Sequence, residues 1–176
     1  MESKVLTGLL IIFILAPTLA FADDIVNKKT ALILDSVVNW HERVKLMDEV
    51  APVGSPKVRE TLAEVFYNSL QNFACPSLLY HAVNGLRYFP NDTKAIEVVR
   101  EGMGNREPLI RMISIEVLGI IGSENDIVYL RPFLASRHSY EAIKAQVAID
   151  SILKRTGGSE RITRLPAMPT NRRHRY

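Results

Sequence analysis

A twelve-residue pattern occurs three times in the sequence, in copies that begin at residues 78, 110 and 141. The fifth and eighth positions hold mostly small side chains, and the ninth and twelfth hold large apolar ones. These columns are Ala82, Ser114 and Ala145; Gly85, Val117 and Ala148; Leu86, Leu118 and Ile149; and Phe89, Ile121 and Ile152. Their spacing places them on one face of an α-helix. The sequence therefore predicts stacked helical repeats about 31 residues long, in which small side chains let neighbouring helices approach.

Each copy of the pattern is expected to be the first helix of a pair. Pro76 and Pro108 precede two of the copies and fit the first turn of a helix, where the missing amide proton is tolerated. Polar turns at residues 90–93 and 122–125 then separate each first helix from a second one. The repeating unit is therefore helix, turn, helix and loop, and no segment is better explained as a strand.

The second helices are expected over residues 94–101 and 126–134. Asp92 or Thr93 is the expected N-cap of the earlier helix, and Asn125 is the expected N-cap of the later one. Pro132 should kink or shorten the later helix, because proline removes a backbone hydrogen bond and clashes with the preceding turn.

The best-defined copy resembles a known repeat family. Pro-Leu-Ile-Arg at residues 108–111 and Val-Leu-Gly-Ile-Ile-Gly at residues 117–122 look like the start and end of a HEAT repeat, in particular the short HEAT-like repeats of the phycobilisome-lyase type. Val58-Arg59 repeats the apolar-Arg start. The resemblance covers roughly residues 56–155 and is strongest over residues 107–134.

The resemblance implies a stacked, right-handed α-solenoid with a surface for protein binding. It implies no shared catalytic residue, because the family has none. The sequence departs from the family at Leu79 and Ala142, which stand where arginine is usual.

Together, these patterns and the resemblance predict an all-α protein that forms a short right-handed α-solenoid of HEAT-like helix pairs. Residues 23–55 fit the repeat poorly and are expected to form an N-terminal cap of one or two helices, because solenoids need atypical terminal units. Residues 56–155 form the HEAT-like repeats. The mature chain should contain about seven or eight helices.

Residues 1–22 have the features of a secretory signal peptide. Lys4 precedes an apolar run over residues 5–15, and Ala20 and Ala22 supply the small side chains that signal peptidase requires. We therefore expect a periplasmic or secreted protein. The alternative is an N-terminal membrane anchor, because residues 5–22 just reach the length of a membrane-spanning helix.

Residues 156–176 are expected to form a flexible basic tail. Residues 155–176 carry six arginines against Glu160, whereas residues 23–154 hold 15 Lys and Arg against 17 Asp and Glu, a net charge of −2. The tail contains two prolines and no helical period. The run at residues 172–175 could touch anionic lipid, phosphate or nucleic acid, or could be a solvated chain end.

No catalytic, cofactor-binding or metal-binding residue is predicted. His41, His81, His138 and His174 lie in separate predicted elements without zinc-site spacing. Cys75 lies at a helix start, where a thiol can become reactive, but a free cysteine is more often an inert apolar residue. No sequence feature indicates a small-molecule substrate or a cofactor.

The favoured function is a non-enzymatic protein-protein interaction or scaffold module of the cell envelope. Its partner would be an envelope protein or peptide. The alternative is an accessory or lyase-like factor for an envelope enzyme. Binding to a nucleic-acid backbone is a third possibility, but the net negative charge of the body disfavours it, because phosphate binding needs a basic face.

Exposed positions of the second helices are the expected partner-binding residues, because second helices tend to line the concave side of such stacks. These positions are Lys94, Glu97, Arg100 and Glu101 in one unit and Asp126, Tyr129 and Arg131 in the next. Tyr129 and Arg131 are the strongest candidates, since tyrosine and arginine are enriched at binding hot spots. Alternatively, Tyr129 packs between the layers and Arg131 is merely solvated.

The first prediction concerns processing of the amino terminus. The mature protein should begin at Asp23, because Ala20 and Ala22 satisfy the peptidase. Amino-terminal sequencing of the protein released by osmotic shock tests this. An intact amino terminus recovered in the membrane fraction would contradict it.

Overall fold

The computed structural model describes residues 22–71 and 75–158, and all regular structure in this part of the chain is helical. The eight α-helices are a helix over residues 22–34, α2 (Trp40–Val50), α3 (Pro56–Gln71), α4 (Pro76–Gly85), α5 (Thr93–Met103), α6 (Pro108–Ile121), α7 (Ile127–Leu130) and α8 (Ser139–Thr156). They confirm the expected all-α class and the number of helices. The expected signal peptide up to Phe21 and the expected tail from Ser159 onward lie outside the described residues.

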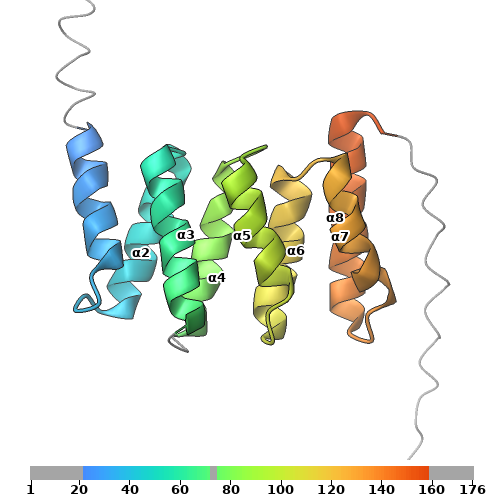
Figure 1. The fold of residues 1–176 in the computed structure, drawn as a ribbon, viewed down its shortest axis with the longest axis horizontal. Coiled ribbons are helices and arrows are strands. Elements are labelled where there is room, and N and C mark those ends of the chain that lie inside the picture. The colour runs from blue at the N-terminus through green and yellow to red at the C-terminus, as the bar shows by residue number, and fades with distance from the viewer. Residues whose placement is uncertain (1–21, 72–74, 159–176) are drawn as a thin grey trace, which may run out of the picture.

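The helices form two layers, and consecutive helices alternate between them (Figure 1). We call α3, α5 and α7 the second-helix layer, and α2, α4, α6 and α8 the first-helix layer. Within the first-helix layer α6 contacts both α4 and α8, and across the layers it contacts α5. This arrangement confirms the expected α-solenoid.

The start of each repeat follows the local sequence signals. Pro76 and Pro108 occupy the first turns of α4 and α6, as predicted. Asp92, one of the two expected caps, is the N-cap of α5, and its carboxylate accepts a hydrogen bond from the Ala95 amide over 3.0 Å.

The second helix of the following unit differs from the prediction. It is broken into a 3-10 helix over Glu124–Asp126, the four-residue α7, and a 3-10 helix over Arg131–Ala135. Asn125 was the wrong cap, because Ser123 is the N-cap and forms a capping box with Asp126. Pro132 lies in the first turn of the last piece, which explains why α7 ends at Leu130.

The two segments before the first repeat form another helix pair. The helix over residues 22–34 is joined to α2 by an ion pair between Lys29 and Glu49 at 2.7 Å. Arg43 on α2 donates from Nε to the Ile33 carbonyl oxygen over 2.6 Å. Ile33 itself is fully buried, so this pair closes the end of the apolar core.

The four aligned columns form the core where the helices meet. Ala82, Ser114 and Ala145 are fully buried, and the large residues of the other columns are at most 5% exposed. Helices α6 and α8 approach closely: a Cβ atom at Gly119 would lie 2.7 Å from the Cα and Cβ atoms of Ala148. Small residues are therefore required here by the distance between the helices.

Adjacent isoleucines on α6 test the assigned core. Ile121 is fully buried and Ile120 is 39% exposed. We expect Ile121→Ala to lower the free energy of unfolding by about 2 to 5 kcal/mol, because it leaves a cavity. Ile120→Ala should lower it by about 1 kcal/mol or less. Urea denaturation of both variants provides the measurement, and equal losses would refute the assignment.

Candidate partner-binding surface

The start of α5 determines which of its side chains face solvent. The Asp92 cap sets the first turn, and the apolar side of the helix, from Ala95 to Met103, is buried. Lys94, Glu97 and Glu101 lie three and four residues apart on the opposite side and are exposed. The structure therefore places these three predicted residues together on one open helix side.

Arg100 and Asp126 were predicted to be exposed, but they form an ion pair between α5 and the turn before α7. Arg100 donates to Asp126 Oδ1 from Nε over 2.9 Å and from Nη2 over 2.5 Å. Asp126 Oδ2 accepts from the Ser123 amide over 2.6 Å and from its hydroxyl over 2.9 Å. Asp126 is only 1% exposed, so the prediction was wrong for this residue: its carboxylate closes the turn.

Opposing effects set the pKa of Asp126. Burial alone would raise it, because burial disfavours the charged form. Hydrogen bonds from Ser123 and the bonds and charge of Arg100 outweigh burial and hold the pKa below its ordinary value. The carboxylate therefore stays ionised at neutral pH and keeps Arg100 in position.

The Arg100 guanidinium group also lies over the ring of Tyr129. Its central carbon is 4.3 Å from the ring centroid, which is within the range of a cation-π interaction. The Tyr129 residue remains 46% exposed, so it is not packed between the layers. Arg100 and Tyr129 together join two successive repeats on the outward side of the second-helix layer.

Arg131 lies apart from the other predicted residues. It is exposed and lines a pocket of about 470 Å³ between α7 and the end of α8. The pocket combines the charged side chains of Glu124 and Arg131 with the apolar side chains of Val128 and Leu153. None of the other predicted residues lines this pocket.

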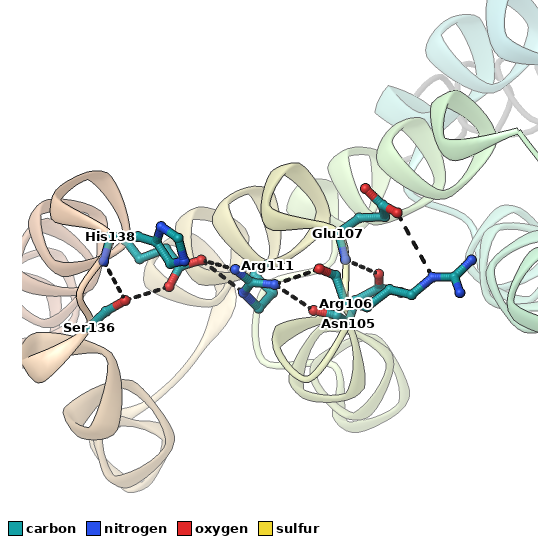
Figure 2. A network of polar contacts seen from close by, with 7 residues as sticks. Asn105, Arg106, Glu107, Arg111, Ser136 and His138 are labelled. Carbon is teal, nitrogen blue, oxygen red and sulfur yellow. Dashed lines mark hydrogen bonds and ion pairs between the residues drawn. The ribbon is translucent and has the colours of Figure 1, made fainter.

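The arginine of the apolar-Arg start in α6 links three segments of the chain (Figure 2). Arg111 donates to Glu141 Oε1 from Nε over 2.8 Å and from Nη2 over 2.5 Å. From Nη1 it donates to the carbonyl oxygens of Asn105 and Arg106, over 3.0 and 2.8 Å. Ser136 adds a hydroxyl hydrogen bond to Glu141 over 2.7 Å. Arg111 therefore fixes the loop before α6 and the start of α8.

The carboxylate partners of these arginines were not found from the sequence. Arg59, in the other apolar-Arg start, pairs with Asp92 at 2.6 Å. Asp92 lies 33 residues after Arg59, and Glu141 lies 30 residues after Arg111. These separations are close to one repeat. A search for acidic residues one repeat downstream of each arginine would have found both pairs.

In the part of the chain that the structure describes, the other reactive or ligating side chains do not gather into a site. Cys75 is partly buried at the start of α4 and packs against the core. In residues 22–71 and 75–158, no group of three or more His, Cys, Asp or Glu residues is placed to hold a metal ion. Within the same residues, no helix is long and apolar enough to cross a membrane.

Comparisons with known proteins agree with this fold. A family model described as HEAT repeats matches residues 63–150, which is half of the chain. No curated protein matches the sequence. Human deoxyhypusine hydroxylase, solved in complex with glycerol, is similar in structure, with a TM-score of 0.66 and 18% sequence identity. The match covers 82% of this chain and 50% of that one, so this chain spans about half the length of the hydroxylase.

The Arg111–Glu141 pair gives a prediction about stability and pH. Burial acts to raise the pKa of Glu141, but the hydrogen bonds from Ser136 and Arg111 and the charge of Arg111 hold it below its ordinary value of 4.5. A lowered carboxyl pKa stabilises the fold above the ordinary value, and this contribution is lost as the pH falls through the folded-state value. We expect Arg111→Met to cost about 3 to 5 kcal/mol at neutral pH, because Glu141 is left buried without its cation.

Urea denaturation at several pH values tests this prediction. The difference between wild type and Arg111→Met should shrink as the pH falls below 4.5. Arg137→Met is the control, because Arg137 is exposed in the loop before α8 and its loss should change the free energy of unfolding by less than about 0.5 kcal/mol. A difference that stays constant with pH would contradict the assignment.

Proposed function

Because the chain belongs to the HEAT-repeat family, we propose that it is a non-enzymatic scaffold of the cell envelope that binds another protein or peptide. The family and the α-solenoid provide a rigid, repetitive support. Such stacks present extended surfaces to their partners. The binding surface in this proposal is the outward side of α5 and α7.

One observation carries the proposal: the exposed side chains of α5 and α7 are held in fixed positions across a repeat boundary. Asp126 holds Arg100, and Arg100 in turn lies over the exposed Tyr129. A partner would therefore meet a preorganised surface of charged and aromatic groups, flanked by Lys94 and Glu97. Preorganisation reduces the entropy lost when a partner binds.

The compartment is part of the proposal. The amino-terminal residues have the pattern of a signal peptide, so the working place would be the periplasm or the outside of the cell. The basic residues after position 158 would support contact with anionic surfaces there.

An accessory or lyase-like role for an envelope enzyme is the second candidate. It is favoured by the structural similarity to a hydroxylase, which shows that this fold also occurs in an enzyme. The two candidates share the binding surface and differ in whether the complex formed has catalytic activity.

Site-specific photocrosslinking tests the proposed surface. A benzophenone amino acid replacing Lys94 or Glu97 should form crosslinks to a partner in intact cells, because both side chains are exposed on the open side of α5. The same replacement at Val53 is the control, since Val53 is 55% exposed but lies between α2 and α3. The crosslinked partner is identified by mass spectrometry.

A second change connects the crosslinks to the proposed hot spot. Adding Tyr129→Ala to the Glu97 probe should reduce the crosslink yield at least about tenfold, because Tyr129 is the exposed aromatic residue of this surface and tyrosine is enriched at hot spots. Circular dichroism confirms that the variant is folded. An undiminished yield, or equal crosslinking from position 53, would overturn the proposed surface.

A further inference from the structure

The pocket between α7 and the end of α8 has an apolar wall. Both helices lie at one end of the stack (Figure 1). The pocket has a volume of about 470 Å³, and Ile127, Val128 and Leu153 form its apolar lining. Ile127 is only 5% exposed, Leu153 packs partly against the core, and Val128 is 61% exposed. An apolar side chain placed in this pocket would therefore bury the exposed part of Val128.

The chain leaves α8 directly beside this pocket. Gly157 follows the helix in the left-handed conformation, with φ at 74°, which ends α8 and turns the chain. Gly158 is itself one of the lining residues. A Cβ atom at Gly158 would lie 2.7 Å from Glu124 Oε1 and 2.9 Å from Leu153 Cδ2, so the backbone passes close against the wall of the pocket. The residues that follow position 158 therefore start at the pocket.

The sequence after the pocket supplies apolar side chains within reach of it. Ile162 and Leu165 are the first large apolar residues after Gly158. A chain extends at most about 3.6 Å per residue, so Ile162 can lie up to about 14 Å from Gly158, whereas a rounded pocket of this volume is about 10 Å across. Ile162 can therefore reach any part of the pocket, and Leu165 can follow it.

The charges of the pocket and of this segment are complementary. Glu124 and Arg131 provide one charge of each sign in the lining. Arg161 and Arg164 each directly precede one of the two apolar residues, and Glu160 is the acidic residue of the segment. Glu124 can thus attract either arginine, and Arg131 can attract Glu160.

The side of α8 that faces away from α6 does not suit another helix pair. In the aligned pattern the tenth position, Gly119 in α6, faces the next repeat, and the sixth position lies one turn before it on the same side. The sixth position is apolar and buried at Val83 and Ile115, but in α8 it is Gln146, which donates a hydrogen bond to Asp150 over 3.0 Å. A polar outer side is typical of a terminal unit. A short segment therefore fits the pocket better than a further repeat does.

We infer that Ile162 and Leu165 of the same chain occupy the pocket between α7 and α8. Their attachment to Gly158 favours this occupant over any other molecule. A short flexible linker gives the attached group an effective concentration in the millimolar range, so even a weak contact is formed most of the time. In this proposal the expected flexible tail begins only after Pro166.

Occupation of the pocket has a consequence for partner binding. Arg131 is both a predicted partner-binding residue and a lining residue of the pocket. The segment at residues 160–165 would compete with any partner that contacts Arg131, but it would leave Lys94 and Glu97 on α5 accessible. The inference thus goes beyond the proposed function, and it can be true or false independently of it.

The rate of thiol modification tests whether the segment is buried. The probe is Leu165→Cys in the full chain, with Cys75→Ser removing the natural thiol. Its rate of reaction with a maleimide, divided by the rate of the same variant in urea, should be at least about tenfold lower than that of Thr170→Cys, because a buried thiol is shielded from the reagent. Division by the rate in urea removes the effect of neighbouring arginines on the thiol.

A change in the pocket connects this protection to the proposed contact. Val128→Asp should raise the rate of the Leu165→Cys probe to that of Thr170→Cys, because it places a charge in the apolar wall. Ile162→Asp should have the same effect without changing any residue of the pocket. Ile143→Asp is the matched control: Ile143 is 44% exposed on α8, lies about 15 Å along the helix from Leu153, and should leave the protection unchanged.

Three outcomes would overturn the inference. They are equal rates for the two probes, protection that survives both Val128→Asp and Ile162→Asp, and protection that increases with protein concentration. The last outcome would show that the segment of a second copy fills the pocket. Circular dichroism of every variant confirms folding before the rates are compared.

Discussion

The close approach of α6 and α8 is the constraint on which the stack depends. At Gly119 there is no room for even one additional carbon atom beside Ala148, so the two helices pack nearly backbone to backbone. Large residues in the next columns, such as Leu118 and Ile149, then fill the space towards the other layer. Each repeat is fixed on the next by this alternation of small and large side chains. This packing therefore also sets the distance between the outward side chains of successive repeats.

Ion pairs between successive repeats determine how far one helix is shifted along the next. Apolar columns alone would tolerate some sliding of one helix along another, because the hydrophobic effect is not directional. Arg59, Arg100 and Arg111 each bond to a carboxylate in the next unit, and each of those carboxylates lies at the start of the helix or turn that follows. The same contacts thus set the register of the stack and the start of the next helix. The open side of α5 owes its fixed position to two of them.

The fold could be predicted from the sequence because the spacing of apolar and polar residues within each helix determines which side of the helix is buried. The columns of Ala82 and Leu118 follow from helical spacing alone, and the exposure of Lys94 and Glu97 follows from the same period. The environment of Asp126 could not be predicted in this way, because it depends on a turn and on an arginine 26 residues away. Ser123 three residues before Asp126 was a local signal for that turn, and the simpler choice of Asn125 as a cap missed it.

The two outward sides of the stack differ in a way that a simple amphipathic rule does not explain. Both layers face solvent, yet α5 has a charged open side and α6 an apolar one. Packing in the core does not account for the difference, since both helices are buried on their inward sides, at Val99 in α5 and at Leu118 in α6. Leu109 is 53% exposed and Tyr140 is 73% exposed, so the exposed part of each side chain adds nothing to the stability of the chain through burial. The charges of Arg87, Glu116 and Lys144 pair with one another among these apolar residues, so the polarity of this side comes from a few ion pairs and not from a continuous charged surface.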